Sequence, residues 1–219
     1  DMPGDKINIE KSHIEKAKVI FPELIKKVKE CATTNSKVVI TVCGGSGVGK
    51  SEIASLLAHY FENMGVGCYT LSGDNYPHRI PVYNDAERLR IFRESAIRGM
   101  ITDGEYSFER FNIIHQYQLE NKDAEPKNIV KYPWYESYIR NGAMGLQGYL
   151  GTEKEINFFE IQNIVKEFKS GAEKIWLKRM GREDTELWYE EVDFSEKDIL
   201  IIEWTHGNSK NYTGVDIPV

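Results

Sequence analysis

The sequence has few cysteines, no long apolar run and no block of basic residues. Only Cys31, Cys43 and Cys68 occur among 219 residues, and no two of them form a Cys-x-x-Cys pair. A small, odd number of cysteines argues against a disulfide framework and predicts reduced thiols in a cytoplasmic protein. No stretch approaches 18 consecutive apolar residues, so we expect no membrane-spanning segment, and the charged first thirty residues do not resemble a signal peptide.

The charge balance is mildly acidic, because 28 Lys and Arg stand against 34 Asp and Glu and give a formal charge of −6. An acidic chain without a Lys/Arg block is a poor candidate for nucleic-acid binding. Hydrophobic residues make up 41% of the chain, which argues against disorder and allows a sizeable core. The length fits one domain or at most two small ones.

Apolar periodicity predicts an α/β fold in which strands alternate with helices around a mainly parallel sheet. Ser12-x-x-Glu15 is typical of a capping box, and it opens a predicted helix that Pro22 kinks or restarts. The other predicted helices cover residues 53–64, 84–100, 107–119 and 158–168, and the predicted strands cover 37–42, 68–71, 174–178, 186–192 and 198–203. Residues 121–155 contain Pro126, Pro133 and several glycines, and we expect a loop there, as a lid or an insertion.

A glycine-rich segment follows the first predicted strand directly. It reads Gly44, Gly45, Ser46, Gly47, Val48, Gly49, Lys50 and Ser51, and it matches the pattern G-x-x-x-x-G-K-[ST]. Glycines let consecutive backbone N–H groups turn toward phosphate oxygens, and the N-terminus of the following helix favours the same anion. Lys50 can neutralise the β- and γ-phosphates of ATP, and the Ser51 hydroxyl can bind Mg²⁺. The alternative is a glycine turn that binds nothing.

Two carboxylates follow predicted strands and are candidates for catalysis. Asp74 ends the second strand, and the carboxyl ends of parallel strands share one edge of a sheet with the phosphate loop. A carboxylate there can accept the proton of an attacking hydroxyl, although Gly-Asp-Asn is also typical of a turn. Glu203 ends the strand Ile199–Ile202 as in a Walker B segment, so it is either a Mg²⁺ ligand opposite Ser51 or an ordinary strand-end residue.

Basic side chains follow Asp74 closely along the sequence. They are His78, Arg79, Arg88, Arg90 and Arg93. Guanidinium groups bind anionic substrates through forked hydrogen bonds, but a solvated helix face would show the same composition. Both interpretations stay open from the sequence.

The phosphate loop, the strand end at Asp74 and the Ile-Ile-Glu203 segment together resemble the P-loop small-molecule kinases. Residues 68–75 with His78 are similar to the Gly-Asp-Asn segment of adenylylsulfate kinases, and this likeness covers residues 38–98. The opening of the loop, the helix over 158–168 and the strand ending at Glu203 resemble the uridine kinase and phosphoribulokinase family. In that family a glycine follows the glutamate, whereas Trp204 stands here.

The resemblance implies a P-loop NTPase fold, ATP and Mg²⁺ as cofactors, an aspartate base at Asp74 and a magnesium role for Glu203. It also makes Asn75, Tyr76, His78 and Arg79 candidate contacts to the acceptor. Both families add an arginine-bearing lid later in the chain. Because residues 215–219 look like the start of another strand, we expect a C-terminal part to be missing.

We therefore predict a single P-loop kinase domain over residues 1–219, with an N-terminal helical extension over residues 1–36. The expected reaction transfers the γ-phosphoryl group of ATP to a hydroxyl of a small molecule, such as a nucleoside or a sugar phosphate. The alternatives are an adenylylsulfate kinase and a catalytically degenerate ATP-binding module. A GTPase-like switch is disfavoured, because Asn121-Lys122-Asp123 lacks the spacing of a guanine-reading motif. A homodimer stays open.

Overall fold

The computed structural model describes residues 7–219, and the chain divides into two compact units. Unit 1 comprises Asp1–Ile80 and Ile156–Val219, and unit 2 comprises Pro81–Glu155. The sequence predicted one domain with an insertion over 121–155, whereas the second unit begins well before that segment. Within the described residues, no helix is both long and apolar enough to cross a bilayer.

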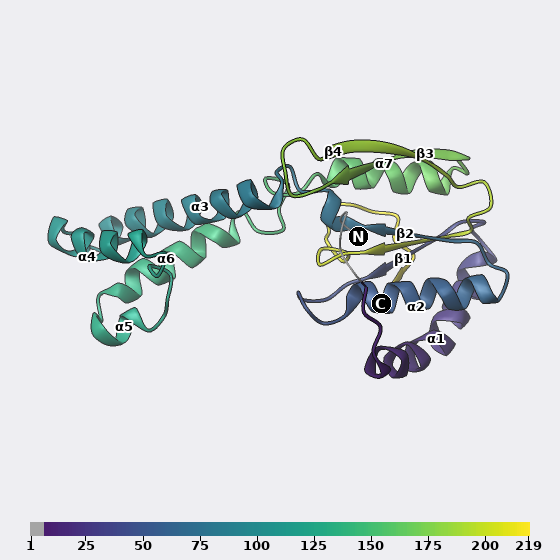
Figure 1. Cartoon of the computed structure of the whole chain (residues 1–219), viewed down its shortest axis with the longest axis horizontal. Coiled ribbons are helices and arrows are strands. Elements are labelled where there is room, and N and C mark those ends of the chain that lie inside the picture. Colours follow the sequence, from purple (N-terminus) through teal and green to yellow (C-terminus); the bar gives the residue numbers. More distant parts are fainter. Residues whose placement is uncertain (1–6) are drawn as a thin grey trace. The chain divides into compact units, whose positions relative to one another are not determined.

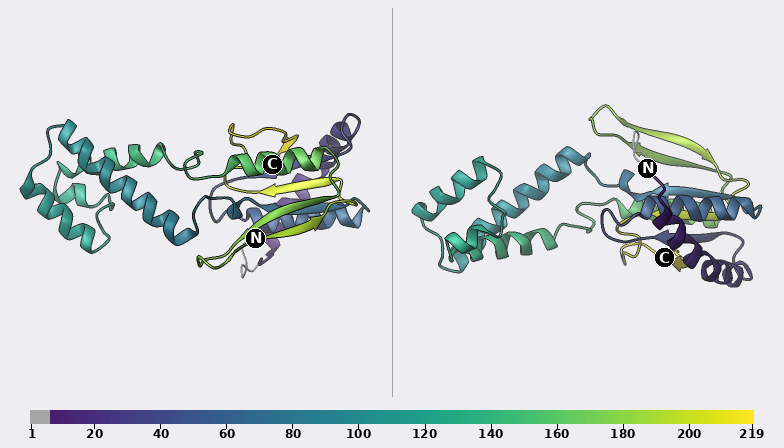
Figure 2. Two further views of the ribbon diagram at one scale, coloured as in Figure 1. Left: turned by 90° about the horizontal axis from the view of Figure 1, so that it is seen from above. Right: turned by 60° about the horizontal axis from the view of Figure 1, so that its bottom comes forward.

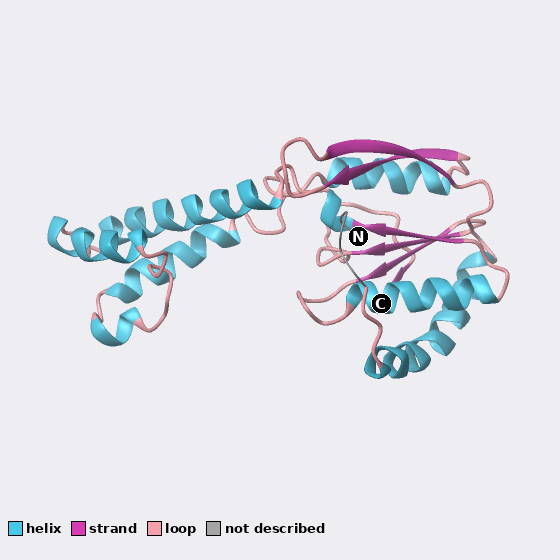
Figure 3. Ribbon diagram, in the orientation of Figure 1, coloured by secondary structure: helices cyan, strands magenta, loops and turns pink. Residues whose placement is uncertain are grey.

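A four-stranded parallel sheet forms the centre of unit 1 (Figure 3). Its strands are β1 (Val38–Val42), β2 (Cys68–Ser72), β5 (Ile199–Glu203) and β6 (Ile217–Pro218), in the order β2-β5-β1-β6. Every residue of β1 and β5 is buried, as expected for parallel strands that are covered on both faces. The predicted α/β class with a mainly parallel sheet is thereby confirmed.

Two layers cover the two faces of this sheet (Figure 1). Helices α1 (Lys11–Ala32) and α2 (Lys50–Asn63) pack on one face. On the other face lie helix α7 (Phe158–Lys169) and an antiparallel hairpin formed by β3 (Lys174–Met180) and β4 (Leu187–Asp193). Strands β1, β2 and β5 lie in the parallel sheet as predicted, whereas the predicted strands over 174–178 and 186–192 form the separate antiparallel hairpin.

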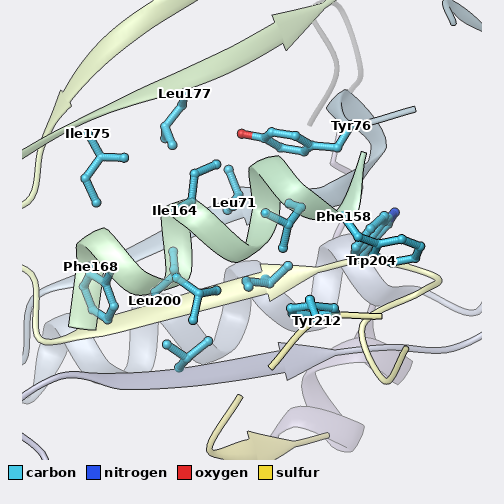
Figure 4. Close-up of a cluster of buried hydrophobic side chains, with 14 of the residues drawn as sticks. Leu71, Tyr76, Phe158, Ile164, Phe168, Ile175, Leu177, Leu200, Trp204 and Tyr212 are labelled. Carbon is cyan, nitrogen blue, oxygen red and sulfur yellow. The ribbon is translucent and has the colours of Figure 1, made fainter. Parts of the chain in front are cut away.

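Side-chain parity along β5 decides which core each residue joins. Ile199 and Ile201 pack with α1 and α2, whereas Leu200 and Ile202 pack with α7. Because successive side chains of a strand point to opposite faces, Glu203 continues toward the α2 face. Trp204 turns to the α7 face, where Figure 4 shows it beside Phe158 and Tyr212 at one end of the core.

Helix α1 begins earlier than the capping signal indicated. Its N-cap is Glu10, whose backbone N–H donates to Nδ1 of His13 at 3.1 Å, and the predicted box of Ser12 and Glu15 lies inside the helix. The helix also continues through Pro22 without a break, so the prediction of a restart there is wrong. Packing against α2 compensates for the hydrogen bond that proline cannot donate. The first six residues of the predicted extension lie outside the described part.

Unit 2 is entirely helical. Its helices are α3 (Pro81–Thr102), α4 (Phe108–Leu119), α5 (Asn128–Lys131) and α6 (Tyr135–Gln147). The prediction of a loop over 121–155 is wrong, because α6 occupies its middle. Gly142 and Gly145 of α6 allow close contact with α3, since an added Cβ would lie 2.5 Å from Phe92 and 2.1 Å from Ser95. The same glycines hide the helical pattern in the sequence.

The chain leaves and re-enters unit 1 at neighbouring positions. Pro77 and Ile156 form an isolated antiparallel bridge, and the N–H of Asn157 donates to the carbonyl of Tyr76 at 2.9 Å. The two connections to unit 2 are thus tied together within unit 1.

Candidate active site

The phosphate loop lies between the carboxyl end of β1 and the N-terminus of α2. Gly47 and Gly49 have φ angles of 75° and 90°, a region that favours glycine. The backbone reverses direction at these two glycines and so reaches the first turn of α2, whose free N–H groups favour an anion. Residues 45–48 are exposed, so the loop is accessible to a polyphosphate.

Lys50, the first residue of α2, folds back over this loop. Its Nζ donates to the carbonyl oxygen of Gly45 at 2.9 Å. The ammonium group is therefore held at the loop itself, within reach of any phosphate that the loop binds. Its long flexible side chain can exchange the carbonyl for a phosphate oxygen without a change in the backbone.

Glu203 is buried next to the start of α2. The Ser51 hydroxyl lies near enough to the Glu203 carboxylate to lower its pKa, as the parity of β5 leads us to expect. Burial raises the pKa of the Glu203 carboxyl, the negative charge of Asp74 raises it further, and Lys50 and Ser51 partly offset both effects. The structure thus brings together Lys50, Ser51, Asp74 and Glu203, as the sequence predicted.

Asp74 lies just beyond the carboxyl end of β2, in the 3₁₀ turn Gly73–Asn75. Ser72 pairs with Glu203 in the parallel register, so Asp74 follows the strand position that neighbours Glu203. The Asp74 side chain is exposed, whereas Glu203 is 4% exposed. An exposed carboxylate can meet an incoming hydroxyl group, and the buried one is placed to act on the phosphate side.

The oxygen atoms of this site suit magnesium. Mg²⁺ is bound by one or two protein carboxylates together with substrate phosphates and water. The Ser51 hydroxyl and the Glu203 carboxylate supply hard oxygen donors, and a buried carboxylate with a raised pKa gains most from a cation. No cluster of three or more His, Cys, Asp or Glu suited to a metal occurs in residues 7–219.

Trp204 supports the turn that carries Asp74. A Cβ added to Gly73 would lie 2.0 Å from Cγ of Trp204, so the indole lies directly against the glycine backbone. The ring is 1% exposed, and its centroid lies 5.4 Å from that of Phe158 and 5.4 Å from that of His206. A large residue after Glu203 is therefore matched by a glycine before Asp74, a pairing that the sequence alone did not indicate.

We expect Gly73→Ala to reduce phosphoryl transfer by at least about tenfold, because the new methyl group must displace the Asp74 turn from Trp204. Steady-state rates of ADP release measure this loss. Gly148→Ala is the matched control, since its methyl group meets nothing closer than 3.5 Å. Equal rates for Gly73→Ala and the wild type would show that the turn tolerates displacement.

Asn75 and Tyr76, predicted as acceptor contacts, lie in the interior of unit 1 with side chains 0% exposed. The Asn75 Oδ1 accepts from the N–H of Met180 at 2.9 Å and fixes the end of β3. Tyr76 belongs to the core on the α7 face, as Figure 4 shows. Both residues serve the fold, so their contact with an acceptor stays a prediction that this burial does not favour.

His78 and Arg79 follow the turn and differ in exposure. His78 is exposed and Arg79 is half-buried, and both interact with other groups of the protein. Their predicted contact with the acceptor remains a prediction. Sequence reasoning did not single out Asn208, which approaches the Thr41 hydroxyl of β1 at 3.4 Å. Its only sequence signal is its place in the loop after β5.

Two comparisons with known proteins agree with this geometry. The family model described as Zeta toxin matches residues 22–99, the segment that holds the phosphate loop and Asp74. Together with the parallel sheet and the glycine turns, this match identifies a P-loop NTPase fold. No solved structure matches the chain significantly.

A curated relative covers most of the chain. Over 198 residues, 90% of the chain, the sequence is 39% identical to the bifunctional alpha-galactosidase/sucrose kinase AgaSK of Mediterraneibacter gnavus. The matched segment makes up 16% of that protein, so the chain spans only a small part of its relative's length. Neither comparison supports the finer likeness to uridine kinases, phosphoribulokinases or the Gly-Asp-Asn segment of adenylylsulfate kinases.

Proposed function

We propose that the chain is an ATP-dependent kinase that phosphorylates a hydroxyl group of a small, uncharged sugar. One observation carries the proposal: the phosphate loop, an exposed carboxylate and a buried carboxylate meet at one edge of the sheet. Regulatory nucleotide switches need no base at this edge, whereas a kinase needs a group that accepts the proton of its acceptor.

Each residue then has a defined task. The loop residues 44–51 bind the polyphosphate through backbone N–H groups, and Lys50 neutralises charge on the transferred group. The Asp74 carboxylate orients the acceptor hydroxyl and takes its proton as the oxygen attacks the γ-phosphorus, and ADP leaves. Ser51 and Glu203 would hold Mg²⁺, which when bound neutralises charge on the phosphates.

The name of the relative supports a sugar as acceptor. A phosphate loop lies in a chain that aligns over 90% of its length, so the aligned part of AgaSK is the part suited to ATP, and the matching activity in its name is sucrose kinase. Sucrose and other neutral sugars are therefore the first candidates for the acceptor.

Three of the arginines that the sequence offered as candidate anion ligands are paired with carboxylates of the protein, which supports an uncharged acceptor. In unit 2, Arg88 pairs with Glu155, Arg90 pairs with Glu87 and Glu94, and Arg93 pairs with Asp123. The carboxylates of Glu155 and Asp123 are at most 2% exposed, so these two pairs are fixed parts of the helical core. These pairs support a structural role for Arg88, Arg90 and Arg93, while Arg79 stays a candidate contact to the acceptor.

An acceptor panel tests the proposal. The protein is incubated with Mg-ATP and, separately, with sucrose, other neutral sugars, nucleosides, sugar phosphates and adenylylsulfate, and products with one added phosphoryl group are identified by mass spectrometry. We expect a dominant product from the neutral sugars. A product from a nucleoside or an anionic acceptor would replace the sugar assignment by the kinases that the sequence first suggested.

ATP binding without any phosphorylated product would instead support the degenerate ATP-binding module. A lid role for residues 121–155 stays a prediction, and the acceptor panel does not test it.

A further inference from the structure

Helix α1 packs along α2 (Figure 1, Figure 2), and its first turn lies beside the phosphate loop. Phe21 of α1 packs edge-on against Tyr60 and Phe61 of α2, with ring centroids 5.0 and 4.9 Å apart. Ala17 and Leu24 of α1 are buried in the same core. These contacts fix the position of α1 along α2, and therefore the position of its first turn.

The first turn of α1 holds one side chain in a defined orientation. The N–H of Glu10 donates to Nδ1 of His13 at 3.1 Å, so Nδ1 carries no hydrogen. In the neutral ring the hydrogen must then be on Nε2, which becomes a donor. The capping contact thus fixes both the direction of the imidazole and its tautomer.

The donor edge of this ring faces the phosphate loop. A Cβ added to Gly49 would lie 2.9 Å from Nε2 and 3.0 Å from Cδ2 of His13, and 3.7 Å from Oε2 of Glu52. Gly49 is the N-cap of α2, where backbone N–H groups are free for an anion. The imidazole donor and these backbone donors therefore border one small region of the loop.

We propose that His13 is a phosphate-binding residue of the active site, supplied by α1 from outside the phosphate-loop motif. The inference rests on the proposed use of a nucleotide at this loop. Nε2–H donates to a phosphate oxygen of the nucleotide, beside the backbone donors at the start of α2. Glu52, the other side chain near this position, is an acceptor and cannot supply that bond. His13 precedes the segment 22–99 that the Zeta toxin family model matches.

Binding measurements without any acceptor test this inference. Calorimetric titrations with Mg-ATP and with inorganic tripolyphosphate compare the wild type with His13→Ala, His13→Glu and Ser12→Ala. Glutamate at this third helical position retains a capping acceptor for the N–H of Glu10 but supplies no donor. Ser12→Ala changes an exposed neighbour in the same turn and serves as the matched control. Thermal unfolding of each variant shows whether α1 remains in place.

A hydrogen bond to a charged group contributes enough to change affinity by about tenfold or more. We therefore expect His13→Ala to bind both ligands about tenfold more weakly, His13→Glu to bind them more weakly still, and Ser12→Ala to match the wild type. Affinities of His13→Glu equal to those of the wild type would overturn the proposal, because capping would then be the only role of His13. Tighter binding by His13→Ala would also overturn it and show that the ring obstructs the loop.

The two proposals can fail separately. If the wild type binds tripolyphosphate in a His13-dependent way but phosphorylates no acceptor, the inference on His13 holds and the proposed kinase activity is wrong. If the wild type phosphorylates a sugar but both His13 variants bind Mg-ATP and tripolyphosphate as tightly as the wild type, the kinase proposal holds and the inference on His13 is wrong. Absence of any polyphosphate binding by the wild type contradicts both.

Discussion

Asp74→Asn should lower the rate of phosphoryl transfer by roughly 10²–10⁴, the usual contribution of a general base. Asparagine retains the size of the side chain and its place in the turn, but its amide cannot take the proton of the acceptor hydroxyl. Because Asp74 is exposed and lies beyond the phosphate loop, ATP binding should be nearly unchanged. Single-turnover rates and ATP titrations on the same preparation separate the two effects.

Asp198→Asn is the control for this experiment. Asp198 lies at the opposite end of β5, where it is exposed and pairs with Lys37 at 3.5 Å. Its replacement should leave the transfer rate unchanged. If Asp74→Asn transferred phosphate as fast as Asp198→Asn, the base would have to be another residue.

Glu203→Gln should have two opposite effects, on activity and on stability. Activity should fall on the order of 100-fold or more, because the carboxylate proposed to hold Mg²⁺ is lost and metal-assisted charge stabilisation contributes several kcal/mol. Stability at neutral pH should rise, because burial raises the pKa of Glu203 and the charged form therefore opposes folding.

The pH dependence of stability gives this prediction its sign. With a raised pKa, the folded protein retains the Glu203 proton at pH values where the unfolded chain has released it. The free energy of unfolding of the wild type should therefore fall as pH rises through the window from the ordinary glutamate pKa to the raised one. In Glu203→Gln this fall should be absent.

Urea unfolding of both proteins from mildly acidic to neutral pH measures the difference. A Glu203→Gln variant that is less stable than the wild type at neutral pH would mean that the favourable interactions of the carboxylate with Lys50 and Ser51 outweigh the cost of burial. Glu191→Gln is a suitable control, because Glu191 is exposed on the hairpin and pairs with Lys174 at the surface.

The edge of the sheet that carries the candidate site could be predicted because its signals are local. The phosphate loop, Asp74 and Glu203 each follow a run of apolar residues, and parallel strands place the residues after their carboxyl ends together. Strand parity also follows from the sequence, and it sends Glu203 toward Ser51 and Trp204 to the opposite face. Strand parity assigns a side chain to a particular neighbour only when it is known which helix covers which face of the sheet.

The remaining features depend on contacts between distant segments. In the sequence Gly142 indicates a break in a helix, yet it is the residue that lets α6 approach Phe92 of α3. The residues next to Arg93 in the sequence do not reveal its carboxylate partner, because Asp123 is thirty residues away. The contact of His13 with Gly49 likewise needs the packing of α1 on α2. No local pattern contains these pairings.

The bridge between Pro77 and Ile156 makes the chain modular. The segment from Pro81 to Glu155 is flanked in unit 1 by Pro77 and Ile156, which form a bridge with each other. We therefore expect that its length and composition can change while β2, β5 and β1, which carry the proposed nucleotide site, keep their register. An exchange of this whole segment between related chains needs only two junctions, and they lie side by side.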